Sequence, residues 1–363
     1  MKVAHLVISG DVAGGQLVAL QLAHASRGRG DEALFVSPAS GTFLDRAAAE
    51  GFETHLADVG RLHRVGGARA LARLLRDQRV DLLHTHTLAA ANAVGRVAAG
   101  RAGIPVVSHL HIENYFRPAT KLLLRLADNI TARRCAALVA VSEATRRAYE
   151  RQGYPRRIEV VYNGVELDGA SAGGLRAELG IPEGAPLVGE VGRLCDVKGQ
   201  RELIEALATL PDLRAVFVGA DLEHGGAYER ELEQTAERLG VRDRVVFAGR
   251  LEDPGRLLGE LDVLALPSWT EGLPLVVLEA MARRRAVVAT PVGGTPEVVV
   301  DGETGLLVPP RDPEALAGAL GRLLGDSELR TRMGDAGYER VRARFSADAM
   351  TGRMLAIYDE VVR

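Results

Sequence analysis

Two glutamates, eight positions apart, lie on either side of an expected helix start in the C-terminal half of the chain. Glu271 and Glu279 bound the run Glu-Gly-Leu-Pro-Leu-Val-Val-Leu-Glu, which follows an apolar stretch at 263–266 that is typical of a buried strand. Pro274 suits the first turn of a helix, where its missing N–H breaks no hydrogen bond. Glu271 is therefore expected in the loop and Glu279 just over one turn into the helix. Both carboxylates could bind sugar or ribose hydroxyls. Alternatively, Glu271 is an acid that favours the positive end of a helix dipole, and Glu279 is a solvated acid on the helix surface.

The start of this helix could also bind an anion. Backbone N–H groups at a helix N-terminus carry about half a positive charge in total and point toward whatever lies before the helix. The donors expected here belong to Gly272, Leu273 and Leu275. A phosphate group is the kind of ligand that such donors bind.

Two basic residues lie in a glycine-bounded loop after another expected strand, at 187–191. Arg193 and Lys198 belong to the run Gly-Arg-Leu-Cys-Asp-Val-Lys-Gly-Gln. Fixed cations at a strand end could bind a diphosphate and offset the charge that develops on it. The alternative is that both residues are ordinary surface bases in a loop. The chain has 42 arginines and only three lysines. A lysine at position 198 therefore indicates a site that needs a compact ammonium group and has no room for the larger guanidinium group of arginine.

A glycine pair, Gly14 and Gly15, lies in the first expected strand-to-helix turn. Without side chains, these residues let the backbone approach a ligand closely, although such a turn can be purely geometric. The turn lacks the G-x-G-x-x-G spacing of a dinucleotide site, and the chain contains no G-x-x-x-x-G-K-[ST] phosphate loop. A P-loop NTPase is therefore excluded.

Eight of the nine histidines lie in the first 111 residues. Two pairs, His84 with His86 and His109 with His111, end expected strands with a spacing of two, which puts each pair on one strand face. A metal site would need further ligands, and neither an Asp-x-Asp pair nor an H-E-x-x-H motif supports one. We therefore expect no metal here, and histidines with structural roles or hydrogen bonds to a sugar hydroxyl.

These residues can lie close together only in a fold that brings the ends of several strands to one edge of a sheet. The sequence predicts two domains of this kind. Continuous apolar runs alternate with helical patterns, as in parallel sheets covered on both faces. The expected fold class is α/β, with two doubly wound, Rossmann-like domains facing each other across a cleft. The domains are expected at 1–163 and 164–345, with a glycine-rich linker at 164–186. The expected strands are 3–8, 33–36, 82–84, 106–110, 137–141, 159–162, 187–191, 215–218, 245–247, 263–266 and 287–289.

Composition excludes several other classes of protein. The 363 residues are 47% hydrophobic and 26% charged, which is typical of folded soluble domains. The two cysteines, Cys135 and Cys195, cannot make a disulfide framework or a cysteine-based zinc site, and they fit a reducing cytoplasm. No apolar run is long enough to span a membrane, and no signal peptide is expected. The net charge of −3 and the 4% aromatic content do not fit a nucleic-acid binder.

A basic helical segment, Arg117–Arg134, could contact a membrane surface. Bases repeat every four residues along it, next to an apolar stripe. The bases are Arg117, Lys121 and Arg125, and the stripe consists of Leu122, Leu126 and Ile130. Such a helix could lie on anionic lipid and meet a lipid-linked acceptor, whereas a buried stripe with a solvated basic edge is the alternative.

Together these motifs resemble the retaining glycosyltransferases of family four, which have the GT-B fold. The resemblance covers essentially the whole chain and is carried by Gly14-Gly15, Arg193…Lys198-Gly199, Glu271-x7-Glu279, Thr290-Pro-Val-Gly-Gly and Asp301-Gly-Glu-Thr-Gly-Leu-Leu-Val. It implies that a nucleoside-diphosphate sugar binds mainly to the second domain, without a metal or other cofactor. It also implies that a final helix at about 346–363 crosses back to the first domain.

The resemblance also implies residue roles. The residues implied in catalysis are Arg193, Lys198, Glu271 and His111, and those implied in donor binding are Gly14, Gly15, Gly272, Leu273, Leu275 and Glu279. Arg193 and Lys198 would bind the diphosphate, Glu279 the ribose, and Glu271 and His111 the donor sugar. Ile112 stands where family members often have an acid.

The expected function is transfer of a glycosyl group, with retention, from a nucleoside-diphosphate sugar to a hydroxyl group. The acceptor would be a glycan, a lipid-linked molecule or a small molecule, reached in the cytoplasm or at the inner face of the membrane. A sugar-nucleotide epimerase of the same fold is one alternative. A non-enzymatic sugar-binding protein is another, but it would require export.

Overall fold

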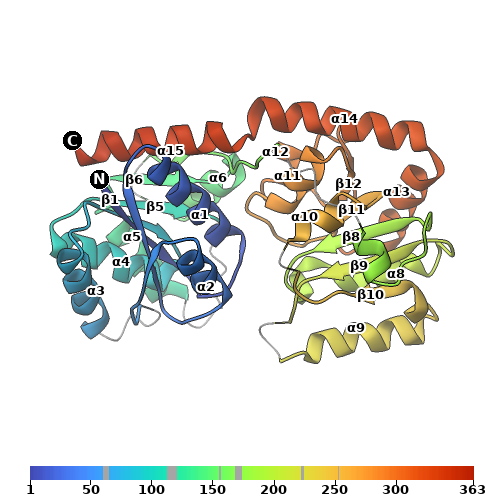
Figure 1. The fold of residues 1–363 in the computed structure, drawn as a ribbon, viewed down its shortest axis with the longest axis horizontal. Coiled ribbons are helices and arrows are strands. Elements are labelled where there is room, and N and C mark those ends of the chain that lie inside the picture. The colour runs from blue at the N-terminus through green and yellow to red at the C-terminus, as the bar shows by residue number, and fades with distance from the viewer. Residues whose placement is uncertain (60–64, 113–120, 155–156, 168–173, 222–224, 252) are drawn as a thin grey trace. The chain divides into compact units, whose positions relative to one another are not determined.

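The computed structural model describes residues 1–59, 65–112, 121–154, 157–167, 174–221, 225–251 and 253–363. Contacts divide the chain into two compact units. Unit 1 consists of Met1–Gly164 together with Ala347–Arg363, and unit 2 consists of Val165–Ser346. The expected boundary after residue 163 lies one residue before this division. The two units are described separately (Figure 1).

Unit 1 contains a sheet of seven parallel strands in the order β3-β2-β1-β4-β5-β6-β7. The strands are β1 (Lys2–Val7), β2 (Glu32–Ser37), β3 (Glu53–Leu56), β4 (Leu82–His86), β5 (Val106–Leu110), β6 (Ala137–Ala140) and β7 (Glu159–Val160). The helices are α1 (Gly14–Gly28), α2 (Thr42–Ala49), α3 (Val65–Asp77), α4 (Ala89–Ala102), α5 (Lys121–Ala132), α6 (Glu143–Arg151) and α15 (Ala347–Val362). The strand order reverses between β1 and β4, which makes this the topological switch point of the sheet.

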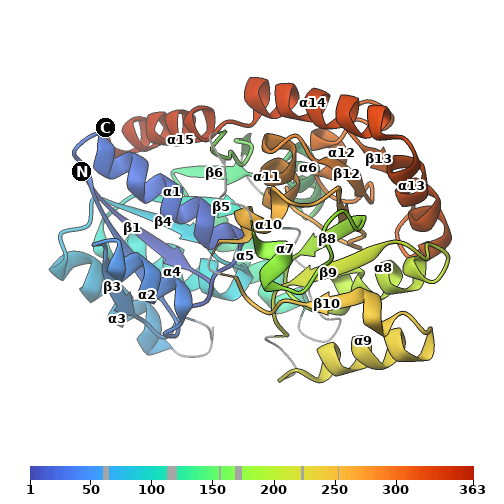
Figure 2. The ribbon, with the colours of Figure 1, turned by 45° about the vertical axis from the view of Figure 1, so that its right-hand side comes forward.

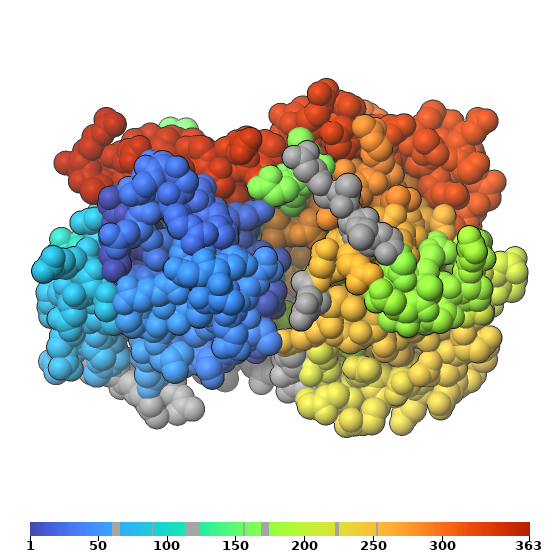
Figure 3. Space-filling model, in the orientation of Figure 1, coloured from blue at the N-terminus to red at the C-terminus, as the bar shows by residue number. Residues whose placement is uncertain are grey.

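Helices cover the unit 1 sheet. All residues of β4 and β5 are buried, as expected for parallel strands with helices on both faces. The last helix, α15, packs beside α1 in both ribbon views (Figures 1 and 2). Its Tyr358 hydroxyl lies 2.6 Å from Nδ1 of His84 on β4, so the C-terminal helix is tied to the centre of the sheet. In Figure 3 the N-terminal residues, blue to cyan, form a continuous surface on the side toward the viewer.

Unit 2 contains a sheet of six parallel strands in the order β10-β9-β8-β11-β12-β13, which reverses between β8 and β11. The strands are β8 (Leu187–Val191), β9 (Arg214–Val218), β10 (Val245–Phe247), β11 (Val263–Leu266), β12 (Ala286–Ala289) and β13 (Leu306–Leu307). The α-helices are α7 (Leu175–Glu178), α8 (Gln200–Leu207), α9 (Ala227–Arg238), α10 (Pro254–Leu258), α11 (Leu275–Ala282), α12 (Thr295–Val298), α13 (Pro313–Gly325) and α14 (Ser327–Arg344). The 3₁₀ helices are η1 (Asp196–Lys198) and η2 (Arg242–Arg244).

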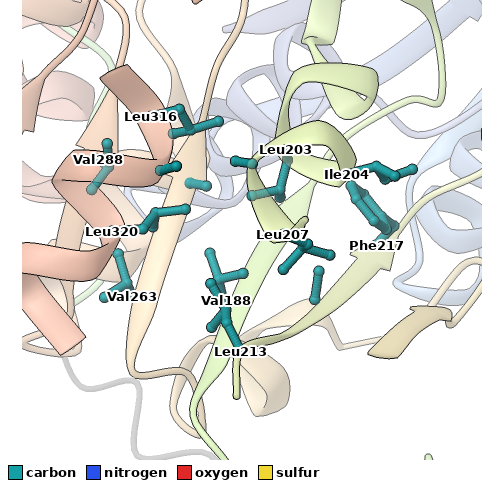
Figure 4. Close-up of a cluster of buried hydrophobic side chains, with 14 of the residues drawn as sticks. Val188, Leu203, Ile204, Leu207, Leu213, Phe217, Val263, Val288, Leu316 and Leu320 are labelled. Carbon is teal, nitrogen blue, oxygen red and sulfur yellow. The ribbon is translucent and has the colours of Figure 1, made fainter. Parts of the chain in front are cut away.

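The core of unit 2 lies between the sheet and the helices α8 and α13. Val188 and Val263 on neighbouring strands meet Leu207 of α8 and Leu320 of α13, and these four side chains are completely buried (Figure 4). Burying a leucine or valine fully stabilises the fold by about 1.5–3 kcal/mol. This packing fixes β8 and β11, the two strands from whose ends the candidate site residues extend.

The expected α/β class with two Rossmann-like domains is confirmed, but two strands were not predicted. Both β3 and β13 lie at sheet edges, and their sequences Glu-Thr-His-Leu and Leu-Leu are too polar or too short to give a continuous apolar run. The start of α11 also differs from the expectation, because Pro274 precedes the helix as its N-cap instead of occupying its first turn.

Candidate functional site

The predicted site residues lie where the strand order of each sheet reverses. In unit 2, Arg193 and Lys198 follow β8, and Glu271 follows β11, which is the neighbour of β8. In unit 1, Gly14 and Gly15 begin α1 after β1, and β4, the neighbour of β1, ends at His86. Ligands of open α/β sheets bind outside the carboxyl ends of the strands at such points. The topology therefore singles out the same loops as the sequence.

In unit 2, Lys198 and Glu271 form an ion pair. The Lys198 Nζ lies 2.6 Å from Oε1 of Glu271, and the two side chains are 20% and 9% exposed. Burial acts to lower the pKa of Lys198, but the adjacent Glu271 carboxylate, together with Glu190 and Cys195, opposes this, and the pKa is raised. The ammonium therefore keeps its charge at the end of β8, and the structure brings together two residues that are 73 positions apart.

The loop that carries Arg193 and Lys198 is held from inside by Gln200, the first residue of α8. Its amide nitrogen donates to the Arg193 carbonyl over 3.0 Å and to Oε1 of Glu190 over 2.7 Å. Its amide oxygen accepts from the Cys195 backbone N–H over 3.3 Å. Arg193 itself is exposed at the end of β8.

Sequence reasoning missed Glu190, which lies on β8 and is almost completely buried. Burial raises the pKa of this carboxyl well above its ordinary value, so the neutral form is favoured. The signal was present, because an acid in the apolar run Leu-Val-Gly-Glu-Val is costly to bury without a partner. The partner, Gln200, could not be read from the strand alone.

The loop that carries Glu271 is tied to its surroundings on two sides. The Trp269 backbone N–H donates to the Val197 carbonyl over 2.8 Å, which joins this loop directly to the Lys198 loop. On the other side, the Gly294 N–H donates to the Gly272 carbonyl over 2.8 Å. The Lys198–Glu271 pair is therefore placed by backbone contacts, as well as by the attraction between its charges.

Close contact with the Glu271 backbone requires a glycine at position 293. Gly293 has a φ of +54°, and a Cβ atom placed there would lie 1.8 Å from the Glu271 carbonyl oxygen. A side chain would therefore meet both a strained backbone conformation and a clash that only a backbone shift could relieve. The Thr290-Pro-Val-Gly-Gly motif thus acts as a support for Glu271, a role that its sequence did not reveal.

Glu279 lies on α11, five residues into the helix, and its side chain is partly buried. Burial raises the pKa of Glu279, and the nearby Arg283 guanidinium opposes this shift only in part. Arg283 donates to the backbone carbonyl of Glu279 over 3.0 Å. At the start of the same helix, Gly272 and Leu273 are buried and Leu275 is partly buried.

In unit 1, the glycine turn packs against His111, which directly follows β5. A Cβ atom at Gly15 would lie 3.4 Å from Cγ and Cδ2 of the His111 ring, so the glycine backbone lies against the imidazole. The helix α1 begins at Gly14 itself. Gln16 is buried, and its amide donates to the Ser9 hydroxyl over 3.1 Å.

Five histidines of unit 1, His5, His84, His86, His109 and His111, form one continuous group. Nδ1 of His5 lies 3.1 Å from Nε2 of His86, and Nδ1 of His86 lies 2.9 Å from Nε2 of His111. The sequence had pointed to His84, His86, His109 and His111, but not to His5. His5 was missed because its place beside β4 depends on strand pairing, in which it lies opposite His84.

Two trios in this group are close enough to hold a metal ion: His5, His84 and His86, and His86, His109 and His111. Burial lowers the pKa of all five histidines, so their rings are neutral and could act as ligands. Both trios, found among the described residues, consist of imidazoles alone, and no anionic side chain would offset the charge of a buried dication. The absence of a metal requirement stays a prediction.

The predicted membrane segment is only partly described, because residues 113–120, and with them Arg117, lie outside the described residues. Its remainder forms α5, on which Leu126 and Ile130 are 53% and 52% exposed. These two positions contradict the alternative of a buried stripe. Arg133 and Arg134 are exposed at the end of the segment.

Comparison with known proteins identifies the family. A family model for glycosyltransferase family 4 matches residues 12–168, and one for glycosyl transferases group 1 matches residues 174–340. A D-inositol 3-phosphate glycosyltransferase of Xylanimonas cellulosilytica is 33% identical over 308 residues, which are 78% of this chain and 72% of that protein. The chain belongs to glycosyltransferase family 4.

Other family 4 relatives match over a smaller part of their length. A D-inositol 3-phosphate glycosyltransferase of Corynebacterium glutamicum is 38% identical over 223 residues, 57% of this chain and 53% of that protein. The chain thus spans about half the length of that relative.

The fold is the GT-B fold. The crystal structure of Anabaena HepE in complex with UDP-glucose has a TM-score of 0.89 and 26% identity, covering 99% of this chain and 100% of HepE. This likeness agrees with the two parallel-sheet α/β units. None of the helices within the described residues has the length and apolar character that a membrane crossing requires.

Proposed function

We propose that this protein transfers a sugar, with retention of anomeric configuration, from a nucleoside-diphosphate sugar to an acceptor hydroxyl group. The observation that carries the proposal is the Lys198–Glu271 pair, which lies at the switch point of the unit 2 sheet in a family 4 chain. A cation beside a carboxylate suits the diphosphate and the sugar hydroxyls of such a donor.

Bond breaking at the anomeric carbon leaves negative charge on the departing diphosphate. Arg193, Lys198 and the start of α11 would stabilise that charge, because fixed cations and backbone dipoles need no reorganisation during the reaction. The departing phosphate accepts the proton of the acceptor hydroxyl on the face that it leaves. The new glycosidic bond then forms on that same face, and the products are a glycoside and a nucleoside diphosphate.

The other site residues would position the donor. Glu279 is partly buried with a raised pKa, and ribose hydroxyls would give its carboxyl the hydrogen bonds that a buried acid needs. Glu271 and His111 are assigned to the donor sugar, and Gly14 and Gly15 to the diphosphate. No metal is included, because two fixed cations take the place of a divalent ion.

The names of the relatives suggest the first compounds to test. HepE was crystallised with UDP-glucose, and two relatives are named for D-inositol 3-phosphate. A panel of UDP-, GDP-, ADP- and TDP-sugars would be scored by thermal shift, and then by nucleotide release with and without an acceptor. The proposal expects one donor to raise the melting temperature and to release nucleotide faster when an acceptor is present.

Two outcomes of this panel favour the alternatives. An epimerase would change the sugar while the nucleotide stays attached. A sugar-binding protein would bind without either reaction. Failure of every nucleotide sugar to bind would contradict the proposal itself.

The proposal includes a peripheral membrane contact at α5, supported by the exposed Leu126 and Ile130. The acceptor could then be lipid-linked, although a glycan or a small molecule stays compatible with the site. Flotation with vesicles of anionic lipid tests this contact. The double variant Leu126→Ser/Ile130→Ser should lose flotation, whereas Leu56→Ser, which changes another exposed leucine of unit 1, should keep it. Absence of flotation by the unaltered protein would remove the membrane contact.

A further inference from the structure

Three histidines of unit 1 form a chain of hydrogen bonds that leads from the sheet to the predicted donor contact. His5 on β1 bonds His86 at the end of β4 over 3.1 Å, and His86 bonds His111 over 2.9 Å. His5 and His86 are buried, while His111 is partly exposed and lies against Gly15. His86 uses both ring nitrogens within this chain, one toward each neighbour.

Burial keeps all three rings neutral. It lowers the pKa of His5 to about 3 and that of His111 to about 4, and it lowers the pKa of His86 well below its ordinary value. A neutral imidazole carries one N–H and one acceptor nitrogen. Each of the two hydrogen bonds needs one donor and one acceptor, so the three protons are not placed independently.

Only two arrangements of the protons satisfy both bonds. In the outward arrangement, His5 and His86 donate from Nδ1, and His111 carries its proton on Nδ1. In the inward arrangement, His111 and His86 donate from Nε2, and Nε2 of His5 carries a proton. Nε2 of His5 is buried and has no partner among the described residues. An unpartnered buried N–H is rarer than an unpartnered acceptor, which favours the outward arrangement.

We propose that His86 is a positioning residue that holds His111 in the Nδ1–H form, so that His111 presents a hydrogen-bond donor to an oxygen of the donor sugar. This inference rests on the proposed function for its substrate, and on the His5–His86 and His86–His111 hydrogen bonds for its geometry. Within the described residues no hydrogen bond is found for Nδ1 of His111, so this N–H would be available to a ligand.

The neighbouring histidines do not share this role. His84 bonds the Tyr358 hydroxyl through Nδ1, and neither nitrogen of His109 has a hydrogen-bond partner among the residues that the structure describes. Their rings stack near the chain without bonding to it. The three members of the hydrogen-bond chain come from successive neighbours in the sheet, because His5 lies on β1, His86 ends β4 and His111 directly follows β5.

The first test reads the protons directly. The 363-residue chain would be labelled with ¹⁵N-histidine, and the ring nitrogen shifts would be assigned with single histidine variants. The proposal expects His86 and His111 both to carry the proton on Nδ1. A proton on Nε2 of His111 would overturn it, and so would a stoichiometric metal ion on the cluster.

The second test uses two amide substitutions of His86, each of which keeps a different one of its two hydrogen bonds. The amide nitrogen of His86→Asn lies as many bonds from the backbone as Nδ1 and can still donate to His111. The amide of His86→Gln corresponds to Nε2 and keeps only the side toward His5. His55→Asn, at a partly exposed histidine of the same unit, is the control.

Binding of UDP-glucose and of UDP would be measured for each variant by calorimetry. We expect His86→Gln to weaken UDP-glucose binding about 10-fold, the scale of one hydrogen bond. His86→Asn and His55→Asn should stay within about threefold of the unaltered protein, a smaller change than the loss of one hydrogen bond. UDP binding should not change in any variant, which also shows that the fold is retained.

Equal UDP-glucose affinities of His86→Asn and His86→Gln would overturn the inference. If the unaltered protein bound neither UDP-glucose nor another nucleotide sugar, the proposed function would fail instead. In that case the ¹⁵N measurement of the ring protons would still test whether His86 holds His111 in the Nδ1–H form.

Discussion

At the scale of single residues, the account depends on the charge of Lys198. Replacing Lys198 with alanine should cost about 2–4 kcal/mol of transition-state stabilisation, the scale of removing one preorganised donor. The measurement is kcat/KM for the donor that the nucleotide-sugar panel identifies. Arg201→Ala, which removes an exposed ion pair with Glu231 in the same unit, is the control and should change little. Near-normal turnover of the Lys198 variant would contradict the assignment.

Glu190 gives a prediction about pH. Because its pKa is raised in the folded protein, the folded state holds a proton that the unfolded chain releases above its ordinary pKa of 4.5. Stability should therefore fall as the pH rises above that value, by up to about 1.4 kcal/mol per pH unit. Glu190→Gln keeps an oxygen for Gln200 but cannot ionise, so its melting temperature relative to the unaltered protein should rise from pH 5 to pH 8. Parallel pH profiles of the two proteins would show that Glu190 does not titrate in this way.

The sequence allowed some of these residues to be predicted, and physical reasons explain the others. Lys198 and Glu271 stand out because a rare lysine and a helix-start acid follow predicted strands. Glu190 and His5 act through partners on other elements. Their roles depend on strand order and register, and the pattern of residue types along one sequence does not contain this information.

At the scale of elements, the site depends on loops that touch each other closely. Gly293→Ala should destabilise the protein and lower activity, because its Cβ would meet the Glu271 carbonyl and its φ is positive. Gly302→Ala is a matched control, since Gly302 also has a positive φ, of +74°, but open space around it. Both variants carry a backbone strain of about 1–2 kcal/mol.

Melting temperature and kcat/KM together separate the two effects. The Gly293 variant should melt at a lower temperature than the Gly302 variant and lose at least about 10-fold in kcat/KM, as expected when a hydrogen-bonding group is displaced. The Gly302 variant should keep its activity. Equal effects in both variants would mean that strain alone, and not contact with Glu271, explains the loss.

Among the elements, strands that form continuous apolar runs could be predicted. The strands β8, β10 and β11 were expected at the residues where the structure has them, although β10 lies at a sheet edge. The edge strands β3 and β13 carry less of that pattern. The apolar stripe of α5 was recognised, but whether Leu126 and Ile130 are covered could be decided only from the folded chain.

At the scale of the whole molecule, the account predicts chemistry without a metal ion. Dialysis against EDTA should leave the rate of transfer unchanged, because the fixed cations of unit 2 would stabilise the leaving diphosphate. The rate would be measured before and after dialysis, with metal content determined in parallel. A loss of activity that Mg²⁺ restored would place a cation on the diphosphate. A loss that Zn²⁺ restored would point to the histidine trios of unit 1.

The central claim is transfer of a sugar with retention, and the anomeric configuration of the first-formed product tests it most directly. An α-linked nucleotide sugar from the panel would be incubated with its acceptor, and proton NMR of the glycoside would be recorded before any later exchange. The account predicts an α-linked product together with one equivalent of nucleoside diphosphate. A β-linked product would contradict the claim of retention, and nucleotide release without any glycoside would contradict the claim of transfer.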